Sequence, residues 1–174
     1  MRRAMLWCCL LLAGCLDLDL PRGEAVKGEI VEGRVIAVAD GDTLTVLDDG
    51  LVEHKLRLAF VDAPEKAQAF GNVAKWQLSS RVYGRAIRAE LIDVDRYGRG
   101  VAQVWLGGED VNLALLNTGY AWHYTRYAER IQSGTEFARY AAAERQARAG
   151  QLGLWQGARP QPPWQYRQRK RAGT

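Results

Sequence analysis

Five short segments with β-strand character follow one another between residues 30 and 106. This succession constrains the fold more than any other feature of the chain. The segments are rich in Val, Ile and Thr or alternate in part between apolar and polar residues, and turn-forming residues separate them. They are Ile30–Val38, Thr43–Leu47, Leu51–Val61, Ala86–Asp93 and Val101–Leu106.

The third segment, Leu51–Val61, is bounded by two turn signals and carries Arg57. Asp48-Asp49-Gly50 forms the turn before it, because Asp-Gly supplies a position with positive φ. Pro64 has no N–H to donate, so the strand must end before it. Alternate side chains point to opposite faces of a strand, so Arg57 is predicted to face away from most of the large apolar side chains.

Helices are predicted after the third and the fifth strand. Val73–Val82 has apolar residues at four-residue spacing, and Asp110 is placed to cap a helix that ends near Asn117. Thr135–Ala149 is a further helix, with Thr135 as its cap and Gly150 after its end. Five short strands with about three covering helices favour an α+β architecture built on a small closed barrel, the OB-fold.

The N-terminus has the composition of an export signal. Arg2 and Arg3 precede the apolar run Ala4–Ala13, which is shorter than the ~20 residues that a membrane-spanning helix needs. The run ends in Leu12-Ala13-Gly14-Cys15, which resembles a bacterial lipobox. We therefore expect residues 1–14 to be cleaved and Cys15 to carry a lipid. The predicted location is the periplasm or cell surface, with a membrane anchor. The alternative is an ordinary secretory signal with an incidental cysteine, which predicts a secreted protein.

The remaining chain divides into three parts. We expect a tether at residues 15–27, one folded domain at residues 28–157 and a proline-rich basic tail at residues 158–174. The three prolines at 160, 162 and 163 favour an extended polyproline II conformation in the tail. All three cysteines lie in the first 15 residues, so the domain has neither a disulfide framework nor a cysteine-based metal or catalytic site.

The net charge of +4 is carried by the two ends of the chain. The leader holds two arginines and the last segment holds five basic residues, which leaves 17 basic and 20 acidic side chains in residues 15–155. A polyanionic partner would therefore bind through a local site and not through a general positive surface.

Charged residues recur at the ends of three predicted strands. The motifs are Asp40-Gly41-Asp42-Thr43, Arg57 with Asp62-Ala63-Pro64-Glu65, and Asp95-Arg96-Tyr97-Gly98-Arg99. Each motif alone is typical of a turn with solvated charges. Together they would place carboxylates and two arginines at one rim of a barrel, a set that can hold a metal ion, a phosphate and a water molecule.

This combination resembles the staphylococcal nuclease-like (thermonuclease) family. The resemblance extends to Val111-Asn112-x-Ala114-Leu115-x3-Gly119-Tyr120-Ala121 and to Gly153-Leu154-Trp155, and it covers roughly residues 29–157. It implies an OB-fold and a Ca²⁺-dependent phosphodiesterase that acts on DNA and RNA and leaves 3′-phosphate ends. No protein partner is evident from the sequence.

The resemblance also implies roles for individual residues. Asp42, Asp62 and the main-chain carbonyl of Ala63 would bind Ca²⁺, a cation that prefers oxygen ligands and keeps several waters. Ala63 stands where the family often has threonine, and only its main-chain oxygen is needed. Glu65 would orient or deprotonate the attacking water.

Five further residues are implied to contact the substrate. Arg57 and Arg99 would grip the scissile phosphate, as bidentate guanidinium groups can. Arg96 and Tyr127 match nucleotide-holding positions of the family. Tyr124 lies beside a second tyrosine position, which Thr125 occupies here. Tyr97 is expected to pack against the protein.

Two other functions are compatible with the sequence. The domain could be a non-catalytic OB-fold module that binds nucleic acid at the cell envelope, or a structural envelope lipoprotein that retains the site as a relic. Arg57, Glu65 and Arg99 argue against both, because a binding module does not need the full set. A histidine-based zinc site is disfavoured, because the chain has only two histidines and they are far apart in sequence. His54 is expected to be a packed side chain.

Overall fold

The computed structural model describes residues 20–173. The predicted leader, the lipidation of Cys15 and the first part of the tether lie outside the described residues. The described end of the tether is attached to the domain, since the main chain of Pro21 and Gly23 hydrogen-bonds to Glu53.

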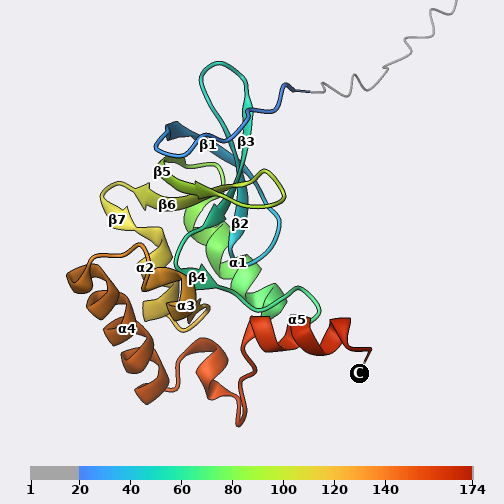
Figure 1. Ribbon diagram of the computed structural model, residues 1–174, viewed down its shortest axis with the longest axis vertical. Helices are drawn as coiled ribbons and strands as arrows, with labels where there is room; N and C mark the ends of the chain where they lie inside the picture. Colours follow the sequence, from blue (N-terminus) through green and yellow to red (C-terminus); the bar gives the residue numbers. More distant parts are fainter. Residues whose placement is uncertain (1–19, 174) are drawn as a thin grey trace, which may run out of the picture.

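A closed five-stranded β-barrel forms the centre of the domain (Figure 1). Its strands lie in the order β3-β2-β1-β5-β6, all antiparallel, and a parallel pairing of β3 with β6 closes the barrel. The strands are β1 (Ile30–Val38), β2 (Thr43–Leu47), β3 (Glu53–Leu58), β5 (Ala86–Val94) and β6 (Gly100–Leu106). A short β7 (Glu109–Asp110) extends the edge of β6. The predicted OB-fold is confirmed.

The third predicted strand is shorter than its sequence pattern indicates. It ends at Leu58, because Phe60 adopts a positive φ of 63° and turns the chain. The chain then continues as β4 (Val61–Asp62), which pairs with β8 (Trp122–His123) in a separate two-stranded sheet. This turn gives Asp62 a strand and a direction different from those of Arg57.

Asn112 holds that turn against the barrel. Its side chain is fully buried, its Nδ2 donates to the carbonyls of Ala59 and Ala102, and its Oδ1 accepts from the N–H of Val104. One amide thereby satisfies three buried main-chain groups. It also links the end of β3 to β6.

Residues 20–173 form five α-helices, two more than predicted. They are α1 (Gly71–Val82), α2 (Val111–Asn117), α3 (Thr125–Ala128), α4 (Gly134–Ala149) and α5 (Pro163–Arg171), with a 3-10 turn at Gly153–Gln156. Helices α4 and α5 lie beyond one end of the barrel (Figure 1). Asp110 caps α2 as expected, whereas Ser133 and not Thr135 caps α4. The tail departs most from expectation, because a helix begins at its last proline, a residue that is tolerated in the first turn.

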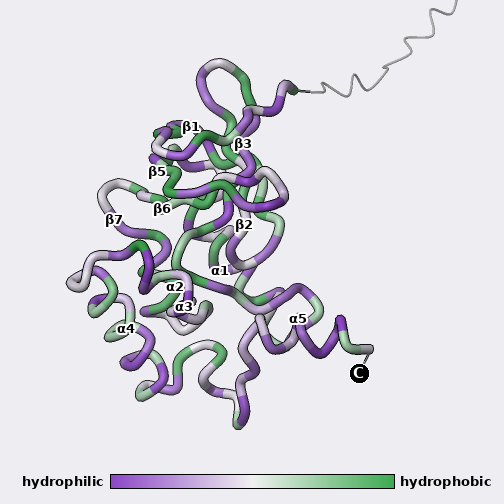
Figure 2. Tube along the Cα trace, in the orientation of Figure 1, coloured by the Kyte–Doolittle hydropathy of each residue, from purple (hydrophilic) through white to green (hydrophobic). Residues whose placement is uncertain are grey.

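The main apolar core fills the barrel and continues beneath the helices that cover it. A smaller cluster around Trp122 and Trp155 lies near the end of α4 and reaches Trp164 of α5. Figure 2 shows α5 as hydrophilic over most of its length. Among the helices of residues 20–173, none is both long enough and apolar enough to cross a membrane.

Replacing Asn112 by Ala should lower the free energy of unfolding by about 2–4 kcal/mol, because three buried main-chain groups each lose a hydrogen bond. Urea-induced unfolding measures this loss. Asn72→Ala, an exposed change in α1, is the control and should shift the value by less than about 0.5 kcal/mol. An equally small effect for both variants would show that Asn112 does not hold the turn.

Candidate active site

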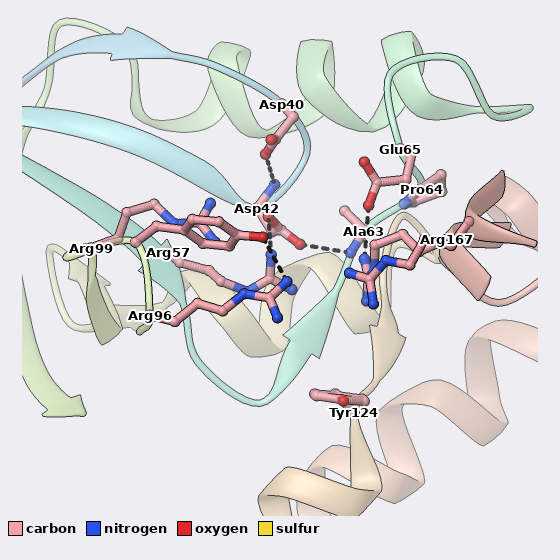
Figure 3. Close-up of a pocket in the computed structure, with 12 residues that line it drawn as sticks. Asp40, Asp42, Arg57, Ala63, Pro64, Glu65, Arg96, Arg99, Tyr124 and Arg167 are labelled. Atoms are coloured by element: carbon pink, nitrogen blue, oxygen red, sulfur yellow. Dashed lines mark hydrogen bonds and ion pairs between the residues drawn. The ribbon is translucent and has the colours of Figure 1, made fainter. Parts of the chain in front are cut away.

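The chain segments that carry the three sequence motifs meet at one rim of the barrel and line a pocket (Figure 3). They are the β1–β2 turn, the end of β3 with the segment that follows it, and the β5–β6 turn. The strand register brings them together. Thr43 pairs with Arg57, so Asp42 lies beside the end of β3, where its carbonyl accepts the N–H of Leu58. The parallel pairing of Leu56 with Gly100 then places the β5–β6 turn next to the same rim.

The Arg57 guanidinium bridges two buried aspartates. Its Nη1 lies 3.2 Å from Asp42 Oδ1 and its Nη2 lies 2.7 Å from Asp62 Oδ1. The Asp42 and Asp62 side chains are 5% and 0% exposed. Asp42 also accepts the N–H of Ala63 at its Oδ2 (3.0 Å). The two predicted metal-binding carboxylates are thus held by one guanidinium group.

Burial makes ionisation of these aspartates unfavourable. It raises the pKa of Asp42 to about 6 and, with a further contribution from nearby Asp40, outweighs the opposing effect of Arg57. Burial also raises the pKa of Asp62, although Arg167 and Arg57 act in the opposite direction. The pKa of Arg57 is raised above its ordinary value, because the attraction of Asp42 and Asp62 outweighs its own burial.

Asp40 and Glu65 flank this pair from two loops. Asp40 Oδ1 accepts the N–H of Asp42 at 3.1 Å, which is the geometry of a turn residue. Glu65 follows β4 in the loop before α1, and its side chain is 40% exposed. A Cβ at Gly71 would be too close to the Glu65 carbonyl, so glycine is required where the loop enters α1.

Arg99 lies on the opposite side of the pocket from Glu65 (Figure 3). Its Nε donates to Asp95 Oδ2 (2.7 Å) and its Nη1 to Thr43 Oγ1 (3.2 Å), so the β5–β6 turn is tied to the β1–β2 turn. The guanidinium groups of Arg96 and Arg99 lie over the Tyr97 ring, 4.7 and 5.5 Å from its centroid. Tyr97 is 69% exposed. It lines the pocket, contrary to the expectation that it packs against the protein.

The two predicted nucleotide-holding tyrosines differ in position. Tyr124 lines the pocket with Arg96. Tyr127 lies in an adjoining hollow, where its ring is nearly parallel to that of Tyr124 and its hydroxyl donates to Asp93 Oδ2 (3.3 Å). Burial raises the pKa of Tyr127, so its hydroxyl stays protonated.

Sequence reasoning did not find Arg167 and Arg171 of α5, which also line the pocket. The aromatic residues Trp164 and Tyr166 suggested that the tail folds back on the domain, but the basic run did not indicate which part of the domain it contacts. His54 lies outside the pocket. It is 9% exposed, and its Nε2 is 2.8 Å from Asp48 Oδ2, in keeping with a packed side chain.

The residues at the rim fit an oxygen-coordinated cation. Two buried carboxylates share the Arg57 guanidinium, and burial, which disfavours their charged forms, raises the pKa of each. Across residues 20–173, no cluster of three or more Asp, Glu, His or Cys side chains is arranged to hold a metal ion. A site made of the Asp42 and Asp62 carboxylates and a main-chain carbonyl has only two such side chains and is therefore not a cluster of this kind. Such a site would leave most of the coordination to water, which Ca²⁺ accepts.

The stability of an Asp42→Asn variant relative to wild type should be higher at pH 8 than at pH 5 when a chelator is present. The wild-type aspartate has a folded-state pKa of about 6, above its ordinary 3.8. Its contribution to stability is therefore complete below the ordinary pKa and is lost as the pH rises through about 6. Asparagine does not titrate. The stability difference should shift in favour of the variant by about 1 kcal/mol between the two pH values.

Urea unfolding at both pH values measures this shift. Asp49→Asn, an exposed change in the β2–β3 turn, is the matched control. A difference between Asp42→Asn and wild type that is the same at both pH values would contradict the burial argument.

Comparison with known proteins places this site in a family. Residues 55–157 match the family model described as "Staphylococcal nuclease homologue". The chain is 38% identical over 138 residues to an "Uncharacterized endonuclease" of Haemophilus influenzae, which covers 79% of this chain and 74% of that protein. It is 32% identical over 151 residues to a "Micrococcal nuclease" of Shigella flexneri, which covers 82% and 83%.

A longer plant protein also matches. It is the "Probable staphylococcal-like nuclease CAN1" of Oryza sativa, and it is 41% identical to this chain over 122 residues. The aligned segment covers 70% of this chain but 35% of that protein. The chain thus spans about a third of the length of that relative. The family match covers more than half of the chain and includes most of the rim residues. The chain belongs to the staphylococcal nuclease family.

Proposed function

We propose that this protein is a Ca²⁺-dependent nuclease that hydrolyses phosphodiester bonds of DNA and/or RNA and leaves 3′-phosphate ends. One observation carries the proposal, the convergence of Asp42, Asp62, Glu65, Arg57 and Arg99 on one rim of the barrel. The nuclease names of its relatives support the same reaction class.

Asp42 and Asp62 would hold the cation, with the carbonyl of Ala63 as the further ligand that the family resemblance implies. Both carboxylates are already oriented by Arg57, and Asp42 is also fixed by the N–H of Ala63. Bound Ca²⁺ would supply positive charge that offsets the charge of the phosphate oxygens.

Glu65 would act on the attacking water. Its carboxylate lines the pocket and is partly exposed, so a water molecule can reach it. A base positioned in this way contributes on the order of 10²–10⁴ in rate. Attack in line with the departing 5′ oxygen would leave the phosphate on the 3′ side.

Arg57 and Arg99 would bind the scissile phosphate from two directions. The Arg57 guanidinium is hydrogen-bonded to Asp42 and Asp62, and that of Arg99 to Asp95. Neither side chain therefore has to lose further conformational freedom when substrate binds. Preorganised guanidinium groups stabilise charge on the equatorial oxygens without reorganisation during the reaction. Lysine would be a poor substitute at either position, because it lacks the planar fork.

Arg96, Tyr97 and Tyr124 would form the adjoining nucleotide contacts. Arg96 lies over the exposed ring of Tyr97, and Tyr124 lines the same pocket. Aromatic rings at this place can stack on bases without regard to sequence. Tyr127 would hold the Tyr124 ring in place, because the two rings are stacked and nearly parallel.

The activity can be tested with residues 16–174 and a single-stranded DNA oligonucleotide. We expect shortened products with Ca²⁺ and none in excess chelator. Glu65→Gln should lower the rate by at least ~10² because the water loses its base. Glu32→Gln, an exposed change outside the pocket, is the matched control and should keep the wild-type rate.

The nuclease proposal would be overturned if the DNA remains full length after incubation with Ca²⁺ and a high concentration of the protein. Binding of the DNA without cleavage would favour the non-catalytic OB-fold module. Undiminished cleavage in chelator would remove the calcium requirement. An unchanged rate for Glu65→Gln would remove Glu65 from the mechanism.

We also propose that the protein is exported and anchored to a membrane through a lipid on Cys15. The lipobox-like Leu12-Ala13-Gly14-Cys15 supports this proposal. Cys15→Ser should move the protein from the membrane fraction to the soluble fraction of fractionated cells, whereas Cys9→Ser should leave it with the membranes. A Cys15→Ser variant that stays in the membrane fraction would argue against the lipid anchor.

A further inference from the structure

Helix α5 lies against the candidate active site and is fastened there by its first turn. Pro163 is buried, and the Trp164 ring contacts the rings of Trp122 and Tyr124, each at a centroid distance of 5.7 Å. Before the helix, the Gln161 carbonyl accepts from the side chain of Gln68, a residue of the loop that carries Glu65. These contacts fix the next turn of α5 over the acidic side of the pocket.

Arg167, one turn after Trp164, reaches the acids of the site directly. Its Nη2 lies 2.7 Å from Asp62 Oδ2, and its Nη1 lies 3.1 Å from Asp62 Oδ1 and 2.8 Å from Glu65 Oε1. Figure 3 shows this guanidinium beside Glu65 and Ala63. The fork thus holds both oxygens of the proposed metal ligand together with the proposed base.

These contacts oppose cation binding. Asp62 Oδ1 already accepts from Arg57, so Arg167 brings a second positive charge to a fully buried carboxylate. Both carboxylate oxygens of Asp62 accept hydrogen bonds from Arg167. A cation that coordinates either oxygen would therefore lie within a few ångströms of the guanidinium group. Like charges at that distance repel strongly in a partly buried site.

We propose that Arg167 is a further functional residue of this active site, a guanidinium that pairs with Asp62 and Glu65 and that an incoming cation must displace. Helix α5 then sets the Ca²⁺ concentration at which the site fills. This inference rests on the calcium role proposed above. A purely structural clamp, in which Arg167 only fastens the tail, is the competing explanation.

Direct titration with Ca²⁺ distinguishes the two. Isothermal titration calorimetry on residues 16–174 without substrate gives the Kd for wild type and Arg167→Ala. If the contact is formed in about nine tenths of the molecules, its removal tightens the Kd about tenfold. Arg167→Lys keeps the charge but loses the fork, so its Kd should fall between the two.

Arg171→Ala is the matched control. Arg171 lies on the same helix and lines the same pocket, and within the described residues no ion pair joins it to Asp62 or Glu65. Its loss changes the net charge by the same amount, and we expect the Kd to change less than about twofold because exposed charges are screened. Circular dichroism checks that each variant is folded.

A Kd for Arg167→Ala that equals or exceeds the wild-type value overturns the inference and leaves the proposed nuclease function standing. An unchanged Kd with a lower melting temperature would establish the clamp instead. Equal tightening by Arg167→Ala and Arg171→Ala would show a general charge effect and no specific displacement. If neither wild type nor any variant binds Ca²⁺, the calcium role fails and this inference fails with it.

Discussion

The site depends on one buried interaction, the bridge from Arg57 to Asp42 and Asp62. Two carboxylates with almost no exposure lie at the barrel rim with the Arg57 guanidinium between them, and Arg167 also pairs with Asp62. Removing one partner of such a group would leave an uncompensated buried charge, which is strongly destabilising. The closed barrel makes the arrangement possible, since the register of β2, β3 and β6 fixes where all three chain segments end.

This arrangement trades stability for chemistry. Burial raises the pKa of both aspartates, so the charged form of each carboxylate costs folding free energy. Arg57 and Arg167 offset part of that cost through Asp62, and a cation could do the same. In our account Arg167 and Ca²⁺ are therefore alternative partners of one carboxylate, and the basic tail becomes part of the active site.

The sequence predicted most of the barrel and the residues of its rim, because strand patterning and the offsets within each motif are local properties. It missed the break after Leu58, where a positive φ at Phe60 is held by Asn112 from a distant helix. It also missed α5. The prolines favoured an extended tail, and the docking depends on Trp164 meeting two aromatic rings about 40 residues away in sequence. Arg167 could not be placed without that contact.

The most direct test of the central claim is the chemistry of the product ends. A defined single-stranded oligonucleotide, incubated with the protein and Ca²⁺, can be analysed by mass spectrometry. The account predicts fragments with 3′-phosphate and 5′-hydroxyl ends, which disappear when Glu65 is replaced by Gln. Intact oligonucleotide, 5′-phosphate ends, or the same fragments from the Glu65→Gln variant would contradict it.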